Sequence, residues 1–346
     1  MAEAAERVLS QRELNRALLE RQFLLTRKRE TLPRALERIG GIQAQYAPSM
    51  YIGLWSRLAD VERERLTRAL ERRTVVQGTL LRSTIHLVSA RDYWPFAIGV
   101  RKARREWWLR IHSEGSREIA AAAARMRRRL ADGPASRAEL VESLSTNLFN
   151  GAGLWLDMVR VPPSGTWERR RADIYAAADD WLGPSGGVTQ EDGIELLVTR
   201  YLGGFGPARP VDVAAWAGLP VQAVSSALDR RSLRRFRDEQ GQLLVDLPRA
   251  PLPDPDTPAP VRFLPTWDAT LLTHARGSGI LPEEFRRLVF NTKTPQSVGT
   301  FTVDGAVAGS WRHEGGHIRL SPFRRLPRAA RGEAEEEAER LAAFQA

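Results

Sequence analysis

The same order of elements, helices followed by a short β-segment, recurs three times within the first 250 residues of this chain. Helices that lead into a β-ribbon make a winged helix-turn-helix unit. The repetition lies in the order of the elements, since the residues themselves show no convincing repeat. A length of 346 residues also exceeds what one compact core usually holds. The sequence therefore predicts an α+β fold with three tandem winged helix-turn-helix units.

The first unit is expected at residues 1–98. Ser10 and Glu13 have the spacing of a capping box, which marks the start of a helix. Pro33 suits the first turn of a second helix. Helices are predicted at residues 11–26, 33–39 and 61–73. Residues 74–89 (TVVQGTLLRSTIHLVS) are rich in Val, Ile, Thr and Leu, and they predict strand with a bend at Gly78.

The second and third units repeat this order and are expected at residues 99–187 and 188–250. In the second unit, Ser136 and Glu139 form another capping box, and a strand is predicted around Trp167. Helices of the second unit are predicted at residues 116–130 and 153–158. Helices of the third unit are predicted at residues 189–202, 210–216 and 220–231, and a strand at 243–247.

The last hundred residues differ in character. Residues 248–260 (PRAPLPDPDTPAP) form a Pro-rich linker that cannot be regular helix. Asp304-Gly305 and Gly315-Gly316 are hairpin signals, so residues 251–330 are expected to form a small β-rich region. Residues 331–346 concentrate Glu and predict an acidic, solvated helical tail.

The charge of the chain favours a polyanionic partner. A net charge of +10 and a pI near 10.7 suit nucleic acid, because Lys and Arg release counterions from phosphates. Only three of the 52 basic residues are Lys, however, and such Arg dominance is also typical of a GC-rich genome. Cys is absent, which excludes disulfides, thiolate nucleophiles and zinc fingers.

No apolar run approaches the roughly 18 to 20 residues that cross a bilayer, and the first ten residues are polar. A cytoplasmic, nucleoid-associated protein without membrane contact is expected. The chain has no evident dimerisation helix, so we expect a monomer. His313-Glu-Gly-Gly-His317 matches a zinc-protease pattern that requires a helix. Because two Gly separate its His residues, a hairpin turn is expected instead, with no metal and no cofactor.

Three groups of polar residues are candidates for contact with DNA. Residues 101–129 are Arg-rich and carry Trp107-Trp108, a pattern that fits phosphate contact with stacking and equally a solvated helix with Trp in the core. A second group alternates along the first predicted strand and consists of Arg82, Thr84 and His86. These residues either contact a ligand or form the solvent side of a wing. A third group, predicted to contact phosphates, follows the last helix of the third unit and consists of Arg231, Arg234 and Arg235.

Gln43-Ala44-Gln45 is the sharpest chemical feature of the sequence. Gly40-Gly41 before it and Pro48 after it favour irregular or extended backbone. In an extended segment, residues two apart project to the same side. Two amides aimed at one point can hold a water, although neither is a strong base. Loop glutamines that bond only to backbone are the alternative.

Several segments resemble the winged-helix DNA-binding family that contains the AlkZ-type DNA glycosylases, which are azinomycin-resistance and interstrand-crosslink repair enzymes. The similar segments are residues 14–25, 41–45, 53–57, 82–88, 92–94, 212–218, 264–268 and 300–305. The family's catalytic motif is Gln, an apolar residue, then Gln or Asp, and Gln43-Ala44-Gln45 has the Gln form. The resemblance implies a C-shaped array of three winged helices around a duplex-sized channel.

The resemblance also implies a function. The expected activity is hydrolysis of the N-glycosidic bond of N7-alkylated guanine in double-stranded DNA, including bulky antibiotic adducts or interstrand crosslinks. Gln43 and Gln45 would position the water, while Arg82, Thr84 and His86 would contact DNA or the lesion. The alternatives are a winged-helix transcription regulator without catalysis, a small-ligand sensor that sequesters a drug, and, more distantly, a metalloprotease.

Overall fold

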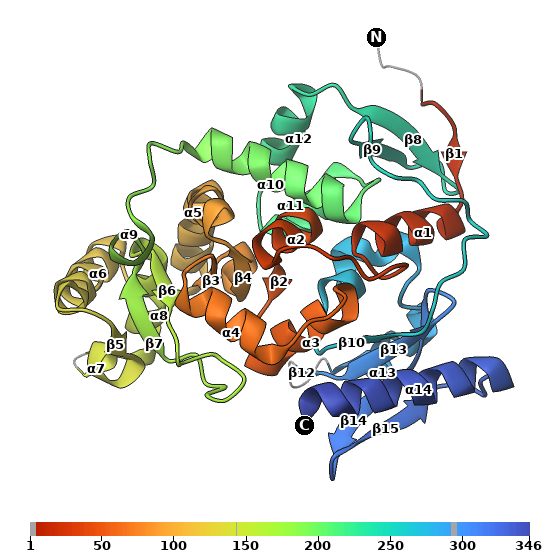
Figure 1. Ribbon diagram of the computed structural model, residues 1–346. Helices are drawn as coiled ribbons and strands as arrows, with labels where there is room; N and C mark the ends of the chain where they lie inside the picture. Colours follow the sequence, from red (N-terminus) through yellow and green to blue (C-terminus); the bar gives the residue numbers. More distant parts are fainter. Residues whose placement is uncertain (1–4, 143, 292–295) are drawn as a thin grey trace.

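The computed structural model describes residues 5–142, 144–291 and 296–346. It has a mixed α+β fold whose parts form recognisable groups in Figure 1. Residues 116–177 form one lobe, residues 190–246 a second group, and residues 262–345 a third (Figure 1). Residues 32–111 lie between these three groups, so the candidate motif at residues 43–45 occupies the middle of the molecule.

The first part of the chain is mainly helical. Its helices are α1 (Gln11–Arg21), α2 (Leu32–Ile39), α3 (Ala47–Arg57), α4 (Arg63–Glu71) and α5 (Ala90–Ile111). Ser10 and Glu13 make the predicted capping box. The first helix nevertheless ends at Arg21 instead of residue 26, because Phe23 has a left-handed φ of 59°. Helices α3 and α5 were not predicted; Pro48 is compatible with α3 because it lies in the first turn, where no N–H is needed.

Residues 74–89 form a hairpin of β3 (Val75–Thr79) and β4 (Ile85–Ser89). The chain reverses through a 3₁₀ turn, η1 (Leu81–Ser83), and not at Gly78, which pairs within the ladder. Arg82 has a φ of 52° in this turn. The prediction that Arg82, Thr84 and His86 alternate along one strand is therefore wrong for Arg82, because a left-handed residue breaks the two-residue period.

One antiparallel sheet of six strands joins the first two predicted units. Its order is β2-β4-β3-β6-β7-β5. The strands not yet named are β2 (Ile42–Gln43), β5 (Ala135–Ser136), β6 (Met158–Arg160) and β7 (Ile174–Ala177). Strand β3 pairs with β6 through Gln77 with Arg160 and Gly78 with Val159. The hairpin of the first unit therefore continues directly into the strands of the second.

The second unit follows the predicted order with two corrections. Its helices are α6 (Ser116–Ala131), α7 (Arg137–Val141), α8 (Thr146–Trp155) and α9 (Ala178–Leu182). The capping box at Ser136 and Glu139 is confirmed. The helix predicted at residues 153–158 begins earlier and ends at Trp155, since Met158 already belongs to β6. The strand expected around Trp167 is absent from the described structure, because Trp167 packs its ring against Tyr51 from an irregular connection.

The third unit matches its prediction closely. It contains α10 (Gln190–Phe205), α11 (Pro210–Ala217), α12 (Val221–Asp229), β8 (Arg234–Asp238) and β9 (Leu243–Asp246). The strand β1 (Val8–Leu9) from the N-terminal end of the chain adds to this hairpin in parallel with β8. A buried bidentate ion pair also links this unit to the start of the chain, because Arg21 bonds both oxygens of Asp246 at 2.8 Å.

The C-terminal region contains the predicted β structure. A four-stranded antiparallel sheet has the order β10 (Arg262–Leu264), β13 (Gly299–Val303), β14 (Ala306–Glu314), β15 (His317–Pro322). The remaining short elements are η2 (Ala269–Leu271), η3 (Thr273–Ser278), η4 (Glu283–Phe285), α13 (Arg286–Val289), β11 (Phe290–Asn291) and β12 (Gln296–Ser297). Asp304 and Gly305 have φ values of 46° and 80° in the β13–β14 turn, which confirms the hairpin prediction.

The acidic C-terminal segment is a docked helix and not a solvated tail. Helix α14 (Arg328–Gln345) lies along the C-terminal sheet (Figure 1). Its inward face buries Ala334, Ala338 and Leu341. Glu337 is also buried and forms an ion pair with Arg27 of the connection after α1. The prediction failed because acidic composition describes the outer face of this helix, whereas its small and apolar residues face the sheet.

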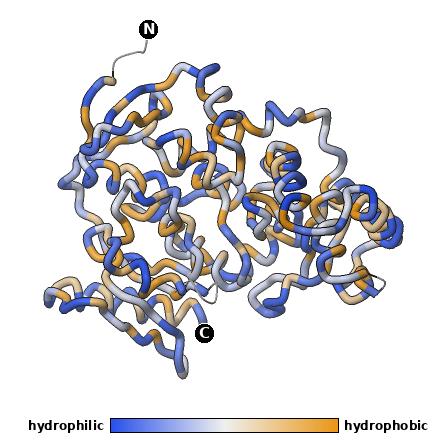
Figure 2. Tube along the Cα trace, turned by 180° about the vertical axis from the view of Figure 1, so that it is seen from behind, coloured by the Kyte–Doolittle hydropathy of each residue, from blue (hydrophilic) through white to orange (hydrophobic). Residues whose placement is uncertain are grey.

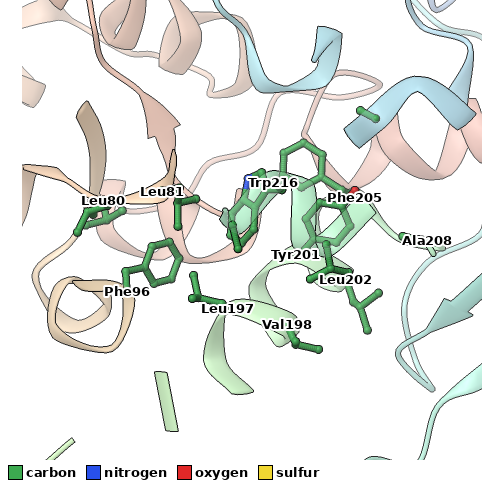
Figure 3. Packing of buried hydrophobic residues seen from close by; sticks show 14 of the residues in the cluster. Leu80, Leu81, Phe96, Leu197, Val198, Tyr201, Leu202, Phe205, Ala208 and Trp216 are labelled. Atoms are coloured by element: carbon green, nitrogen blue, oxygen red, sulfur yellow. The ribbon is translucent and has the colours of Figure 1, made fainter. Parts of the chain in front are cut away.

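A large apolar core holds the first and third units together. In Figure 2 hydrophobic and hydrophilic residues alternate along most helices, as expected of elements with one buried face. Figure 3 shows the ring of Trp216 between Leu81 on one side and Tyr201 and Phe205 on the other. The Trp216 ring centroid lies 5.4 Å from that of Tyr201. This cluster fixes α11 against the 3₁₀ turn that carries Arg82.

Candidate active site

Gln43 occupies the edge strand β2, next to the hairpin. It pairs in register with His86 of β4, and only 8% of its surface is exposed. Nη2 of Arg82 donates to Oε1 of Gln43 over 3.1 Å. Because a guanidinium can only donate, this contact fixes which end of the Gln43 amide faces Arg82.

Gln45 is exposed and is held by the same hairpin. Its Oε1 accepts a hydrogen bond of 2.7 Å from the backbone N–H of Ile85. The N–H of Ala44 in turn donates to the carbonyl oxygen of Ile85 at 2.8 Å. The backbone is extended at Ile42–Gln43 and bends at Gln45, and it brings both side chains to the beginning of β4.

Both amides are anchored through their carbonyl oxygens. Each carbonyl oxygen accepts one hydrogen bond from the protein, so each retains one lone pair. Each amide also carries an NH₂ group with two donors. Each amide therefore retains the capacity to accept from and donate to a further polar group.

Two glycines make the approach of β2 to β4 possible. Gly40 ends α2 with a φ of 80°, and Gly41 follows with a φ of 79°. A Cβ on Gly41 would lie 3.0 Å from the carbonyl oxygen of Leu87. A larger residue would strain this backbone and push β2 from the hairpin, so Gly41 is part of what positions Gln43.

Arg82 connects Gln43 to the third unit. Its Nη1 donates to the carbonyl oxygen of Trp216, near the C-terminal end of α11. Within residues 5–142, 144–291 and 296–346, no carboxylate forms an ion pair with Arg82. Burial lowers the pKa of its guanidinium to about 10. Arg82 is therefore a cation whose hydrogen bonds are directed at two neutral carbonyl oxygens.

His86 is neutral at physiological pH. Burial, together with the positive charge of Arg82, lowers its pKa to about 3. Its Nδ1 lies 3.1 Å from the carbonyl oxygen of Thr84, so Nδ1 carries the proton and donates. The hydroxyl of Thr84 donates to the carbonyl of Leu81 at 3.0 Å. Only 3% of His86 is exposed, and its contact with DNA stays a prediction.

The arginines predicted to contact phosphates lie in the third unit, with Arg231 after α12 and Arg234 and Arg235 in β8, a strand of a different sheet from β2. Nη2 of Arg231 donates to the carbonyl oxygen of Glu195 at 3.1 Å. Arg234 forms an ion pair of 2.9 Å with Glu6, and this contact raises the pKa of Arg234. Arg235 is the next residue of β8 and is half-buried. Contact of these three residues with phosphates stays a prediction.

A cavity of about 300 Å³ opens beside Gln45, between the β3–β4 hairpin and the second unit. Its wall includes Arg104, Arg160 and Trp107, none of which was assigned to the site from sequence. The two adjacent Trp residues differ in exposure: Trp108 is 7% exposed and stacks on His112, whereas Trp107 is 40% exposed. The available sequence signal was the basic and aromatic composition of residues 101–129.

Three further observations concern the His313–His317 motif, metal binding and membrane insertion. His313 and His317 lie on either side of the β14–β15 turn, and Gly315 and Gly316 have φ values of 57° and 82°, so this motif is a hairpin as predicted. Among the described residues, no group of three or more His, Asp or Glu side chains could hold a metal ion. No helix in the described ranges is long and apolar enough to cross a membrane.

Comparisons with known proteins give two matches. A family model described as DNA glycosylase AlkZ-like matches residues 36–344 of the chain. The structure is similar to that of Streptomyces sahachiroi DNA glycosylase AlkZ, with a TM-score of 0.80 and 19% sequence identity over 98% of this chain and 97% of that one. At this identity the structural likeness shows the fold alone. A search of curated proteins found no match.

Proposed function

The chain belongs to the AlkZ-like DNA glycosylase family, and we propose that it hydrolyses the N-glycosidic bond of N7-alkylated guanine in double-stranded DNA. The observation that carries this proposal is the pair of anchored amides. Arg82 and the N–H of Ile85 orient Gln43 and Gln45 toward the start of one strand. Loop glutamines bonded only to backbone would not account for the Arg82 contact.

Hydrolysis of this N-glycosidic bond requires little acid catalysis. Alkylation at N7 makes the guanine cationic, so the base is already a good leaving group and departs through an oxocarbenium-like state. The site must place a water at the anomeric carbon and stabilise the developing positive charge on the sugar. Proximity and orientation of this kind supply several kcal/mol. In our proposal the free lone pairs of Gln43 and Gln45 accept the hydrogen bonds of that water.

Arg82 acts in this mechanism as a positioning residue. It holds Oε1 of Gln43 in one direction and is itself held by the carbonyl of Trp216. Charge-assisted hydrogen bonds are stronger and more directional than neutral ones. His86 supports the same strand as a neutral side chain, since its pKa of about 3 prevents it from adding a second cation beside the site.

We further propose that the three winged helix-turn-helix units surround a duplex in a C-shaped array. The net charge of +10 supports a polyanionic partner, and the Arg-rich hairpin of the third unit would contact phosphates. Bulky adducts and interstrand crosslinks are suitable substrates in an open channel. A lesion of that size cannot enter the tight pocket of a base-flipping enzyme.

Base release from modified duplexes tests the proposal. Purified protein is incubated with duplex DNA that carries N7-methylguanine or an azinomycin-type crosslink, and abasic sites are measured as alkali-labile breaks. We expect release from at least one substrate and its loss in the Gln43→Ala, Gln45→Ala double variant. Retained activity in the double variant would remove the Gln pair from the mechanism.

The alternative of a transcription regulator gives a different result in the same experiment. A regulator binds duplex DNA in a sequence-specific way and releases no base. Tight binding of intact duplex without any abasic site would therefore favour the regulator, and the Gln pair would then be part of loop structure.

A further inference from the structure

The cavity beside Gln45 has a wall with more positive than negative charge. Arg104, Arg137 and Arg160 contribute to this wall, whereas its one carboxylate is Asp157. Asp157 already forms an ion pair of 2.6 Å with Arg101 and lies 3.9 Å from Arg104. Arg137 and Arg160 have no carboxylate partner in the part of the chain that the structure describes. The cavity therefore favours electron-rich or anionic groups.

Buried donors in this wall also lack acceptors. The Nε atoms of Arg104 and Arg160 are buried and have no hydrogen-bond partner among the described residues. Burial lowers the pKa of both guanidinium groups. Thr79 takes one hydrogen bond from each group, since its Oγ1 accepts from Nη1 of Arg160 at 3.0 Å and its carbonyl accepts from Arg104. Nη2 of Arg104 also donates to the carbonyl oxygen of Ala97 at 3.3 Å. Buried donors without acceptors leave the positive charge of both guanidinium groups only partly compensated within the protein.

Aromatic rings supply the rest of the wall. Tyr175 and Phe149 line the cavity beneath the guanidinium groups of Arg160 and Arg137, at centroid distances of 5.1 and 5.0 Å. Trp107, 40% exposed, stands at the same wall. Exposed Trp in a basic surface is a stacking platform for planar groups. A volume of about 300 Å³ matches one ring system and not a whole crosslink.

We propose that this cavity receives a planar aromatic group with oxygen acceptors that belongs to the damaged DNA, and holds it beside Gln45. The inference rests on the proposed function and adds a subsite to it. Two sources share this chemistry. One is an uncharged base that leaves the stack together with its phosphate, and the other is the aromatic part of a bulky adduct.

The cationic alkylated guanine itself is a poor occupant. An N7-alkylguanine carries a positive charge, and Arg104, Arg137 and Arg160 would repel it at close range. The lesion base therefore stays next to the Gln pair while a neutral or anionic neighbouring group enters the cavity. This division of roles allows one site to act on adducts that differ in size.

Kinetics with two substrates tests the subsite and separates its sources. The substrates are duplexes with N7-methylguanine, which has no aromatic extension, and with N7-phenacylguanine, which adds an uncharged aryl ketone. The variants are Trp107→Ala and Arg137→Ala. Leu109→Ala and Arg319→Ala are the matched controls, because Leu109 is 39% exposed on α5, the Arg319 side chain is 73% exposed on β15, and neither residue lines the cavity.

We expect the two cavity variants to raise the half-saturating concentration for N7-phenacylguanine DNA about tenfold, within the range measured for the loss of one stacking contact. The controls should change it less than twofold. A loss on the phenacyl substrate alone assigns the cavity to the aromatic part of the adduct. An equal loss on both substrates assigns it to a base that leaves the stack. No loss on either substrate overturns the subsite.

Binding measurements separate failure of the subsite from failure of the proposed function. In the Gln43→Ala, Gln45→Ala background the lesion stays intact, so the affinity for each duplex is measured by fluorescence anisotropy. A wild-type chain that releases no base refutes the glycosylase, whatever the cavity does. If the phenacyl duplex binds more tightly than the N7-methylguanine duplex, and Trp107→Ala removes this difference, the adduct is the source. Weaker binding of both duplexes in Trp107→Ala supports the base source, and equal binding by all variants refutes the subsite.

Discussion

Replacement of Arg82 by Ala tests whether this residue positions Gln43 or contacts DNA. In the structure its guanidinium bridges two acceptors, Oε1 of Gln43 at 3.1 Å and the carbonyl oxygen of Trp216. Ala removes both hydrogen bonds and the charge. Gln43 is then free to rotate about its side-chain torsions, and the amide loses the orientation that holds the water.

The size of the effect follows from the type of bond that is lost. A hydrogen bond to a charged group contributes about 1.5–3 kcal/mol. If all of this energy serves the transition state, the rate constant falls about 10- to 150-fold, since each 1.4 kcal/mol corresponds to a factor of ten. Because the hydrogen bonds of Arg82 go to Gln43 and Trp216 of the protein itself, we expect a smaller change in duplex affinity than in rate.

Single-turnover base release at saturating enzyme gives the rate constant separately from binding. Arg82→Lys serves as the matched variant, because an ammonium keeps the charge but cannot reproduce the planar fork that bridges two acceptors. We expect Lys to recover little of the rate. The Arg82→Ala, Gln43→Ala double variant should lose little more than Gln43→Ala alone, because the two residues act through one contact. Thermal melting checks that each variant remains folded.

The opposite pattern would refute the positioning role. A phosphate contact predicts an unchanged single-turnover rate, weaker duplex binding, and a salt dependence reduced by about one counterion. It also predicts that Arg82→Lys restores binding. This outcome would return Arg82 to the role that the sequence first indicated.

Three further predictions concern the site charge, the pH dependence and the fold. Gln45→Asp should raise the rate of base release severalfold, because a carboxylate stabilises the cationic sugar better than an amide does; an unchanged or lower rate in single-turnover assays would contradict this electrostatic role. Burial lowers the pKa of His86 to about 3 from the usual 6.5, so the folded chain stays neutral there while the unfolded chain takes up a proton as the pH falls. The free energy of unfolding therefore keeps its full value above pH 6.5 and falls as the pH drops toward 3, so that at pH 5 it is about 2 kcal/mol lower than at pH 8. Urea unfolding at pH 8 and pH 5 should show this decline in the wild type and a smaller one in His86→Asn, and equal declines would disprove it. Asp246→Ala leaves Arg21 buried without its partner and should cost about 3–5 kcal/mol of unfolding free energy, whereas the pair Arg21→Met, Asp246→Leu should recover most of it; a single variant as stable as the wild type would refute this estimate.

Local structure was largely predictable because its causes are local. The capping boxes at Ser10 and Ser136 formed as their spacing indicates. The Asp304-Gly305 and Gly315-Gly316 turns formed hairpins because glycine adopts positive φ without strain. The errors arose where tertiary contacts outweigh local preference. Composition alone did not reveal that α14 docks on the sheet.

The candidate site was only half predictable for a similar reason. Gln43-Ala44-Gln45 is a short motif between residues that break helices, and its non-helical backbone follows from those neighbours. The contact of Arg82 with Gln43 joins residues 39 apart in the sequence. It depends on a left-handed turn at Arg82 that no pattern of polar and apolar residues encodes.

The sequence by itself determined many of the helices and turns, the positive charge and the Gln pair, although it missed α3 and α5. Tertiary structure alone decided that β3 pairs with β6, that β1 pairs with β8 of the third unit, and that a basic, aromatic cavity opens beside Gln45. The physical reason is range. Capping, turns and periodicity involve residues within a few positions of each other, whereas strand pairing and cavities depend on which distant surfaces fit together when the whole core is packed.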